Sequence, residues 1–282
     1  MDFSQTFIAI RKRSMLGLFD LSLLVYRDHG LNILALLAIN ALPWLVLDLL
    51  LLLLSDFGMA DYSQWHWQLL LLTVIQAQYG TMMITLYLGK AMFEGRPSVA
   101  ETVTGFFKAS WFSMWLHGGL RMVFPVTFLI SIGDPTATGW AIFLFLVGMV
   151  FRMSRPFVSE ILLLEKTPVR KKNAGEMKFS KRSSDLHRSD VIAGFIMGSL
   201  IALALTTMLA GLMFHIDATI GLLGTVDLPI QYLYWPVAAW LVASYMAVFR
   251  FMFYINTRIV QEGWEVSLKV MSEGQKMEQS LQ

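Results

Sequence analysis

"DVIAGFIMGSLIALALTTMLAGLM" (residues 190–213) begins with one acidic residue and then carries no charged side chain to its end. A helix needs about 20 apolar residues to cross the hydrocarbon core of a bilayer. The whole chain has the same character, because 56% of its 282 residues are hydrophobic and only 15% are charged. A soluble domain has about 25% charged residues. The sequence therefore predicts an integral membrane protein.

Five further segments are long and apolar enough to span a bilayer as helices. With the quoted stretch, the predicted spans lie near residues 30–55, 67–92, 111–132, 137–163, 190–213 and 232–256. The predicted fold is an all-α integral membrane protein with six transmembrane helices. It forms a single polytopic membrane domain over residues 1–282.

Basic residues predict the topology of these spans. The connections at 56–66, 131–139 and 214–231 contain no Lys or Arg. The remaining connections and both terminal segments are basic, and the positive-inside rule places such segments in the cytoplasm. We therefore expect both termini to be cytoplasmic.

Short amphipathic helices are expected at the cytoplasmic interface. Residues 14–28 place Leu16, Phe19, Leu23 and Tyr26 on one stripe, and residues 98–110 show a similar spacing. A weak three-fold repeat follows each pair of spans and is anchored by a glutamate. The three anchors are Glu94, Glu165 and Glu262.

Ionisable residues inside the spans are candidate functional residues, since each costs on the order of 3 kcal/mol to insert. The candidates are Asp48, Arg121, Glu160 and Arg250. Arg121 lies near mid-depth, so we expect it to pair with Glu160 or Asp48. The pair is either a structural contact that fixes helix register or part of an anionic substrate or proton site.

A basic run precedes the quoted span, in "PVRKKNAGEMKFSKRSSDLHRSD" (residues 168–190). Its cations are Arg170, Lys171, Lys172, Lys178, Lys181, Arg182 and Arg188. Topology and contact with an anionic leaflet explain these charges, and docking of a protein partner is the alternative. The run has a single aromatic residue and no folded basic module, which disfavours nucleic acid. Within the span, Gly194 and Gly198 form a small-xxx-small pattern that predicts close helix packing.

Soluble-type catalytic motifs are missing from the sequence. There is no H-E-x-x-H, G-x-S-x-G, Walker or dinucleotide motif, and the His residues have no ligand spacing. Cysteine is absent. We therefore expect no enzymatic activity, no catalytic residues, no cofactor and no metal.

Three stretches resemble a family of bacterial multi-pass membrane proteins like those of planctomycetes. The first is "IRKRSMLGLFDLSLLVYRDHGLNILALLAINALPW". The second, "RPFVSEILLLEKTPVRKKNAGEMKFSKRSSDLH", places Arg155, Pro156, Glu160, Leu164, Glu165, Arg182, Ser183, Leu186 and His187 at matching positions. The third, "NTRIVQEGWEVSLKVMSEG", carries Arg258, Glu262, Gly263, Trp264 and Leu268.

Related membrane domains are fused to some glycerophosphodiester phosphodiesterases, but the catalytic barrel of those enzymes is missing here. Members of the family tend to sit beside genes for a MoxR-type ATPase, a von Willebrand-like protein and a transglutaminase-like membrane protein. The resemblance implies a non-enzymatic scaffold or assembly subunit of an envelope complex in the bacterial inner membrane. Its expected partners are anionic lipids and other membrane proteins. The alternative is a small-solute or lipid-handling transporter or channel centred on Arg121.

Overall fold

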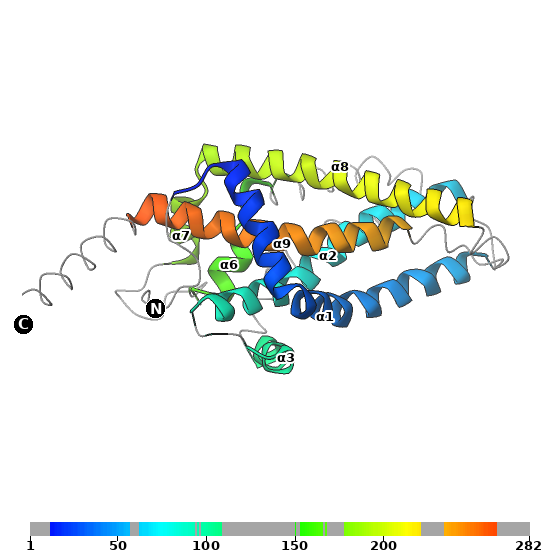
Figure 1. Ribbon diagram of the computed structural model, residues 1–282, viewed down its shortest axis with the longest axis horizontal. Helices are drawn as coiled ribbons and strands as arrows, with labels where there is room; N and C mark the ends of the chain where they lie inside the picture. The colour runs from blue at the N-terminus through cyan, green and yellow to red at the C-terminus, as the bar shows by residue number, and fades with distance from the viewer. Residues whose placement is uncertain are drawn as a thin grey trace, which may run out of the picture.

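The computed structural model describes residues 12–56, 62–93, 95, 97–108, 150, 153–165, 167, 178–220 and 234–263. Within these ranges the fold is entirely helical and contains no strand. The helices are α1 (Met15–Asp56), α2 (Tyr62–Phe93), α3 (Val99–Lys108), α6 (Val158–Leu163), α7 (Phe179–Leu186), α8 (Ser189–Ile220) and α9 (Tyr234–Glu262). Figure 1 shows α1, α2, α8 and α9 along the long axis, with α3, α6 and α7 gathered towards one end.

Three described helices are long and apolar enough to cross a membrane, namely Met15–Leu50 within α1, Ser189–Thr219 within α8, and α9. Six spans are therefore not supported. The second predicted span is helical, as part of α2, but is not among these three. Residues 109–149, with the third predicted span and Arg121, lie outside the described residues.

The fourth predicted span is not a continuous helix to residue 163. The chain leaves the helical conformation at Arg155 and turns through Pro156 and Phe157 before α6 begins. Proline disfavours helical geometry in the residue before it, which explains why the break falls at Arg155. The hydropathy of the segment gave no sign of this break.

Residues 14–28 form the first part of α1 and not a separate helix. Figure 1 shows α1 changing direction along its length. The first part contacts α9, where Phe19 stacks on Phe249 with ring centroids 4.1 Å apart. Leu16 and Leu23 of the expected apolar stripe are exposed, and Leu18, which was not assigned to it, is buried.

The second part of α1 lies against α2. Asn32 donates a hydrogen bond to the Tyr87 hydroxyl at 2.8 Å, and Asn40 lies 3.0 Å from the Met83 sulfur. This part of α1 also packs on α9, because Leu37 and Ala41 form a buried cluster with Trp240.

A short helix at residues 98–110 is confirmed as α3. Ser98 caps it by accepting a hydrogen bond from the Glu101 amide, the S-x-x-E arrangement of a capping box. Gly95, at a φ of +99°, allows the preceding turn. Lys90 of α2 then pairs with Glu101 at 3.0 Å and fixes α3 to α2.

Helix α9 is the centre of the bundle. In α9, 61% of the most apolar stretch is buried, whereas in α8 only 17% of the most apolar stretch is buried. Gly80 of α2 permits a close approach to α9, because a Cβ there would lie 2.2 Å from the Trp240 ring. Gly194 and Gly198, the residues predicted to allow close helix packing, face Phe253 and Phe249 of α9.

Candidate functional site

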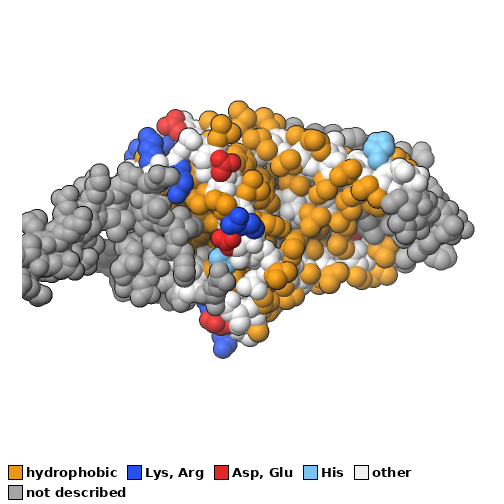
Figure 2. All heavy atoms as spheres, viewed as in Figure 1, with side chains coloured by type: hydrophobic (Ala, Val, Ile, Leu, Met, Phe, Trp, Pro, Cys, Tyr) orange, Lys and Arg blue, Asp and Glu red, His pale blue; other side chains and the backbone are white. Residues whose placement is uncertain are grey.

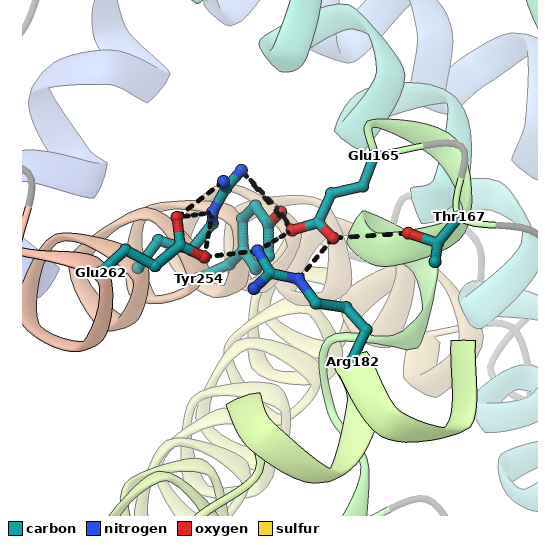
Figure 3. A network of polar contacts seen from close by, with 6 residues as sticks. Glu165, Thr167, Arg182, Tyr254 and Glu262 are labelled. Carbon is teal, nitrogen blue, oxygen red and sulfur yellow. Dashed lines mark hydrogen bonds and ion pairs between the residues drawn. The ribbon is translucent and has the colours of Figure 1, made fainter. Parts of the chain in front are cut away.

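The strongest polar site of the described residues lies at the end of α9, where α7 and the residues after α6 meet it (Figure 3). We call Glu165, Arg182, Tyr254, Arg258 and Glu262 the charged cluster. It contains two of the three glutamates that anchor the sequence repeat, Glu165 and Glu262. The third, Glu94, lies outside the described residues.

Arg182 is the centre of the charged cluster. Its Nε and Nη2 atoms both donate to the Glu165 carboxylate at 2.6 Å, a bidentate geometry that only a guanidinium provides. The Nη2 atom also donates to Glu262 at 2.5 Å. The Arg182 side chain is only 15% exposed, so its expected place in the solvated basic surface is wrong.

The α9 members of the charged cluster follow one another at helical spacing. Arg258 donates to Glu262 four residues later at 2.8 Å and to the Tyr254 hydroxyl four residues earlier at 3.3 Å. The Tyr254 hydroxyl donates to Glu165 at 2.6 Å. Gly263, at a φ of +67°, ends the helix directly after Glu262.

The pKa values of two members of the charged cluster, Glu165 and Arg182, reflect this pairing. Burial alone would raise the pKa of Glu165, but hydrogen bonds from Arg182 and Tyr254 and the charge of Arg258 hold it below its ordinary value of 4.5. The hydrogen bond to Glu165 raises the pKa of Arg182 above its ordinary value, despite burial. Both groups are therefore held in their charged forms.

His187 joins α7 to the turn before α6. Its Nε2 atom accepts a hydrogen bond from the Phe157 amide at 3.0 Å, so Nδ1 carries the proton of the neutral ring and faces the Ser183 carbonyl. Phe157 is fully buried and packs edge-on against Phe253 and Tyr254. The turn, α7 and α9 are thus fixed to one another by both polar and aromatic contacts.

A second ion pair lies further inside the bundle. Glu160 of α6 is fully buried and accepts a hydrogen bond from Arg250 of α9 at 2.6 Å. Arg250 also donates to the Thr85 hydroxyl of α2 at 3.2 Å. The sequence named Glu160 and Arg250 as intramembrane charges but did not pair them.

The remaining predicted residues are spread along the chain. Asp48 is buried and accepts a hydrogen bond from Gln76 at 2.7 Å. Lys178, Lys181 and Arg188 are exposed as predicted. The other cations of the basic run, Arg170, Lys171 and Lys172, lie outside the described residues.

Sequence reasoning missed the role of Tyr254 and Gln76. The Tyr-x-x-x-Arg-x-x-x-Glu spacing of residues 254–262 was a usable signal, because it places all three side chains on one helix face. Gln76 had no such signal, since its partner Asp48 lies on another helix.

The charged cluster has two glutamates and two arginines, so its formal charge balances. Its carboxylates accept hydrogen bonds from neighbouring donors and are poorly suited to act as general bases. Among the described side chains, no three His, Asp or Glu residues are grouped to hold a metal ion. The arrangement suits a structural connection between segments distant in sequence.

Comparisons of the chain with protein-family models, with curated proteins and with solved structures found no match.

Proposed function

We propose that this chain is a non-enzymatic, six-span protein of the bacterial inner membrane, a scaffold or assembly subunit of an envelope complex. One observation carries the proposal. A tightly packed and internally paired group of helices stands beside α8, a long apolar helix that the rest of the described structure covers sparsely.

The packed group leaves little room around its central helix. Trp240 is 1% exposed and lies against Gly80, and Tyr87, Phe249 and Tyr254 are buried in another part of the packed group. The buried Glu160 and Arg250 charges neutralise each other. A rigid, closed interior of this kind is typical of a structural subunit and is poorly suited to alternating access.

The α8 flank is the surface that the proposal assigns to membrane partners. Its exposed side chains include Met197, Leu200, Leu203, Met208, Leu212 and Phe214. On the face of the molecule drawn in Figure 2, hydrophobic side chains cover much of the bundle. The Lys, Arg, Asp and Glu side chains on that face lie towards the left of the view. In a bilayer such a flank contacts lipid or another transmembrane helix.

Basic residues at the charged end support contact with an anionic leaflet. Lys178, Lys181 and Arg188 are exposed, and each cation near such a surface adds about 1 kcal/mol of attraction. The position of these cations beside the charged cluster also supports a cytoplasmic location of that cluster, because the positive-inside rule assigns basic segments to the cytoplasm.

Photo-crosslinking in intact membranes tests the scaffold. A photoreactive residue at Leu200 or Met208 should give discrete adducts with another membrane protein. The matched control is Leu42, which is 58% exposed on α1. Adducts with lipid alone at both α8 positions would contradict a partner on this flank.

The second candidate is a small-solute or lipid-handling transporter or channel. Three buried oxygens favour it, because Asp48 Oδ2, Gln76 Oε1 and Glu160 Oε2 have no hydrogen-bond partner within the described structure. A water-filled path would supply their partners. Cysteine introduced at Thr85 should then react with a water-soluble maleimide, whereas the closed scaffold predicts no reaction.

A further inference from the structure

The contact between Asp48 and Gln76 differs from every other buried carboxylate contact in the described part of the chain. Glu160 and Glu165 each have an arginine partner. Asp48 is fully buried, and its described partner is a neutral amide, the Gln76 side chain, which is also fully buried. An ionised carboxylate in such surroundings is strongly disfavoured, and burial favours its neutral form.

The two side chains leave complementary atoms unsatisfied. Gln76 Nε2 donates to Asp48 Oδ1 at 2.7 Å. The second carboxylate oxygen, Asp48 Oδ2, and the amide oxygen, Gln76 Oε1, have no hydrogen-bond partner among the described residues. Two acceptors cannot satisfy each other, but a carboxylic acid carries one O–H donor. One proton on Oδ2 therefore provides the donor that Oε1 lacks.

We propose that Asp48 is a proton-binding site, and that the bound proton closes a cyclic acid–amide pair with Gln76. The proton comes from water and adds to Oδ2, and no other bond forms or breaks. The protonated pair joins α1 to α2 through two hydrogen bonds. Loss of the proton leaves one hydrogen bond and a buried negative charge, so raising the pH weakens the contact.

Among the side chains that the structure describes, no other titratable group near this end of the bundle replaces Gln76 as the partner. On α2, Tyr87 and Lys90 lie 11 and 14 positions beyond Gln76, roughly 16 Å or more along the helix. On α9 the group at this end is Tyr234, which lies beside Asp217 of α8. The other described group of that part of α8 is His215. The site is independent of the scaffold proposal.

Infrared spectroscopy of the purified protein tests the site directly. A protonated carboxylic acid has a carbonyl stretching band that shifts in deuterium oxide. At mildly acidic pH we expect this band in the wild type and in E160Q, its absence in D48N, and a shifted band in Q76L. Raising the pH should remove it from the wild type. An absent wild-type band at mildly acidic pH, or an unchanged band in D48N, would overturn the proposal.

Thermal unfolding provides a second measurement. Asparagine can donate to Gln76 Oε1 through its amide at any pH, so D48N should keep the contact and unfold at a temperature that does not change as the pH is raised. The wild type should lose stability over the same range. Equal pH profiles would refute the proton site. A wild-type infrared band that disappears on adding sodium ions would also refute it, since a cation would then be the preferred ligand.

Discussion

Arg182 directly follows the exposed Lys181 in sequence, yet its guanidinium joins two glutamates from different parts of the chain. Removing one member of such a group leaves uncompensated charges that are mostly shielded from water. The energetic effect of a residue in this basic run therefore depends on its position, because Lys181 on the same helix is exposed.

Substitution of Arg182 by Leu should leave Glu165 and Glu262 facing each other without their shared cation. We expect a loss on the order of 3 kcal/mol in the free energy of unfolding. Arg182→Lys should fall between Leu and wild type, because a lysine cannot form the bidentate contact. Thermal unfolding in detergent measures the effect, and Lys181→Leu is the matched control. An equal loss in both Leu variants would show that the paired geometry is unimportant.

Glu165 should make stability depend on acidity. Its pKa is lower in the folded protein than its ordinary value of 4.5. The folded state therefore binds fewer protons at Glu165 than the unfolded state, and its stabilisation is present above pH 4.5 and is lost as the pH falls through the folded pKa. Unfolding temperatures recorded on acidification should fall less steeply for Glu165→Gln than for the wild type. Parallel curves would contradict this expectation.

At the scale of the element, α8 shows that one helix can have two different surfaces. Its Gly194 and Gly198 lie against α9, whereas Gly211 has open space around it. The same residue type is therefore required at one part of the helix and dispensable at another.

Leucine substitutions along α8 test this difference. A Cβ at Gly194 would lie 2.9 Å from both Phe253 and Met15, so Gly194→Leu should destabilise the protein by about 1–3 kcal/mol. Gly211→Leu introduces the same side chain into open space and should leave the amount of folded protein in the membrane unchanged. Similar yields of the two variants would remove the case for close α8–α9 packing.

Local signals predicted the elements better than the contacts between them. The apolar spacing of residues 98–110 is a local signal, and the short helix that it predicts is present as α3. The glycine spacing of α8 is also local, but it did not identify α9 as the helix that Gly194 and Gly198 face. The turn at Pro156 was missed because hydropathy dominates the segment. The Asp48–Gln76 and Glu160–Arg250 contacts join different helices, and a single sequence does not specify which helices are neighbours.

At the scale of the whole molecule, the described charges and the apolar flank lie along one axis. Helix α8 runs antiparallel to α9 and rises roughly 48 Å over its 32 residues. Its start adjoins the basic run, whereas its far end carries His215 and Asp217. The positive-inside rule predicts that the charged cluster lies on the cytoplasmic side, and this orientation stays a prediction.

Introduced cysteines test that orientation, since the natural chain has none. In intact cells, cysteine at exposed Thr219 should react with an impermeant maleimide, and cysteine at exposed Ser184 should react only after the membrane is opened. Ser183 is buried and would be a misleading probe. Labelling of Ser184→Cys from outside would reverse the orientation.

The charged cluster also links folding to the order of synthesis. Glu262 follows Arg182 by 80 positions, an interval of about 4–16 s at about 5–20 residues per second during translation. For most of that time Arg182 and Glu165 lack the α9 side chains that complete their contacts. A ribosome that stalls before α9 leaves a chain whose charged cluster lacks Tyr254, Arg258 and Glu262. Membrane proteases that survey nascent proteins would meet an incompletely anchored segment, so synthesis of α9 is expected to protect the charged cluster from degradation.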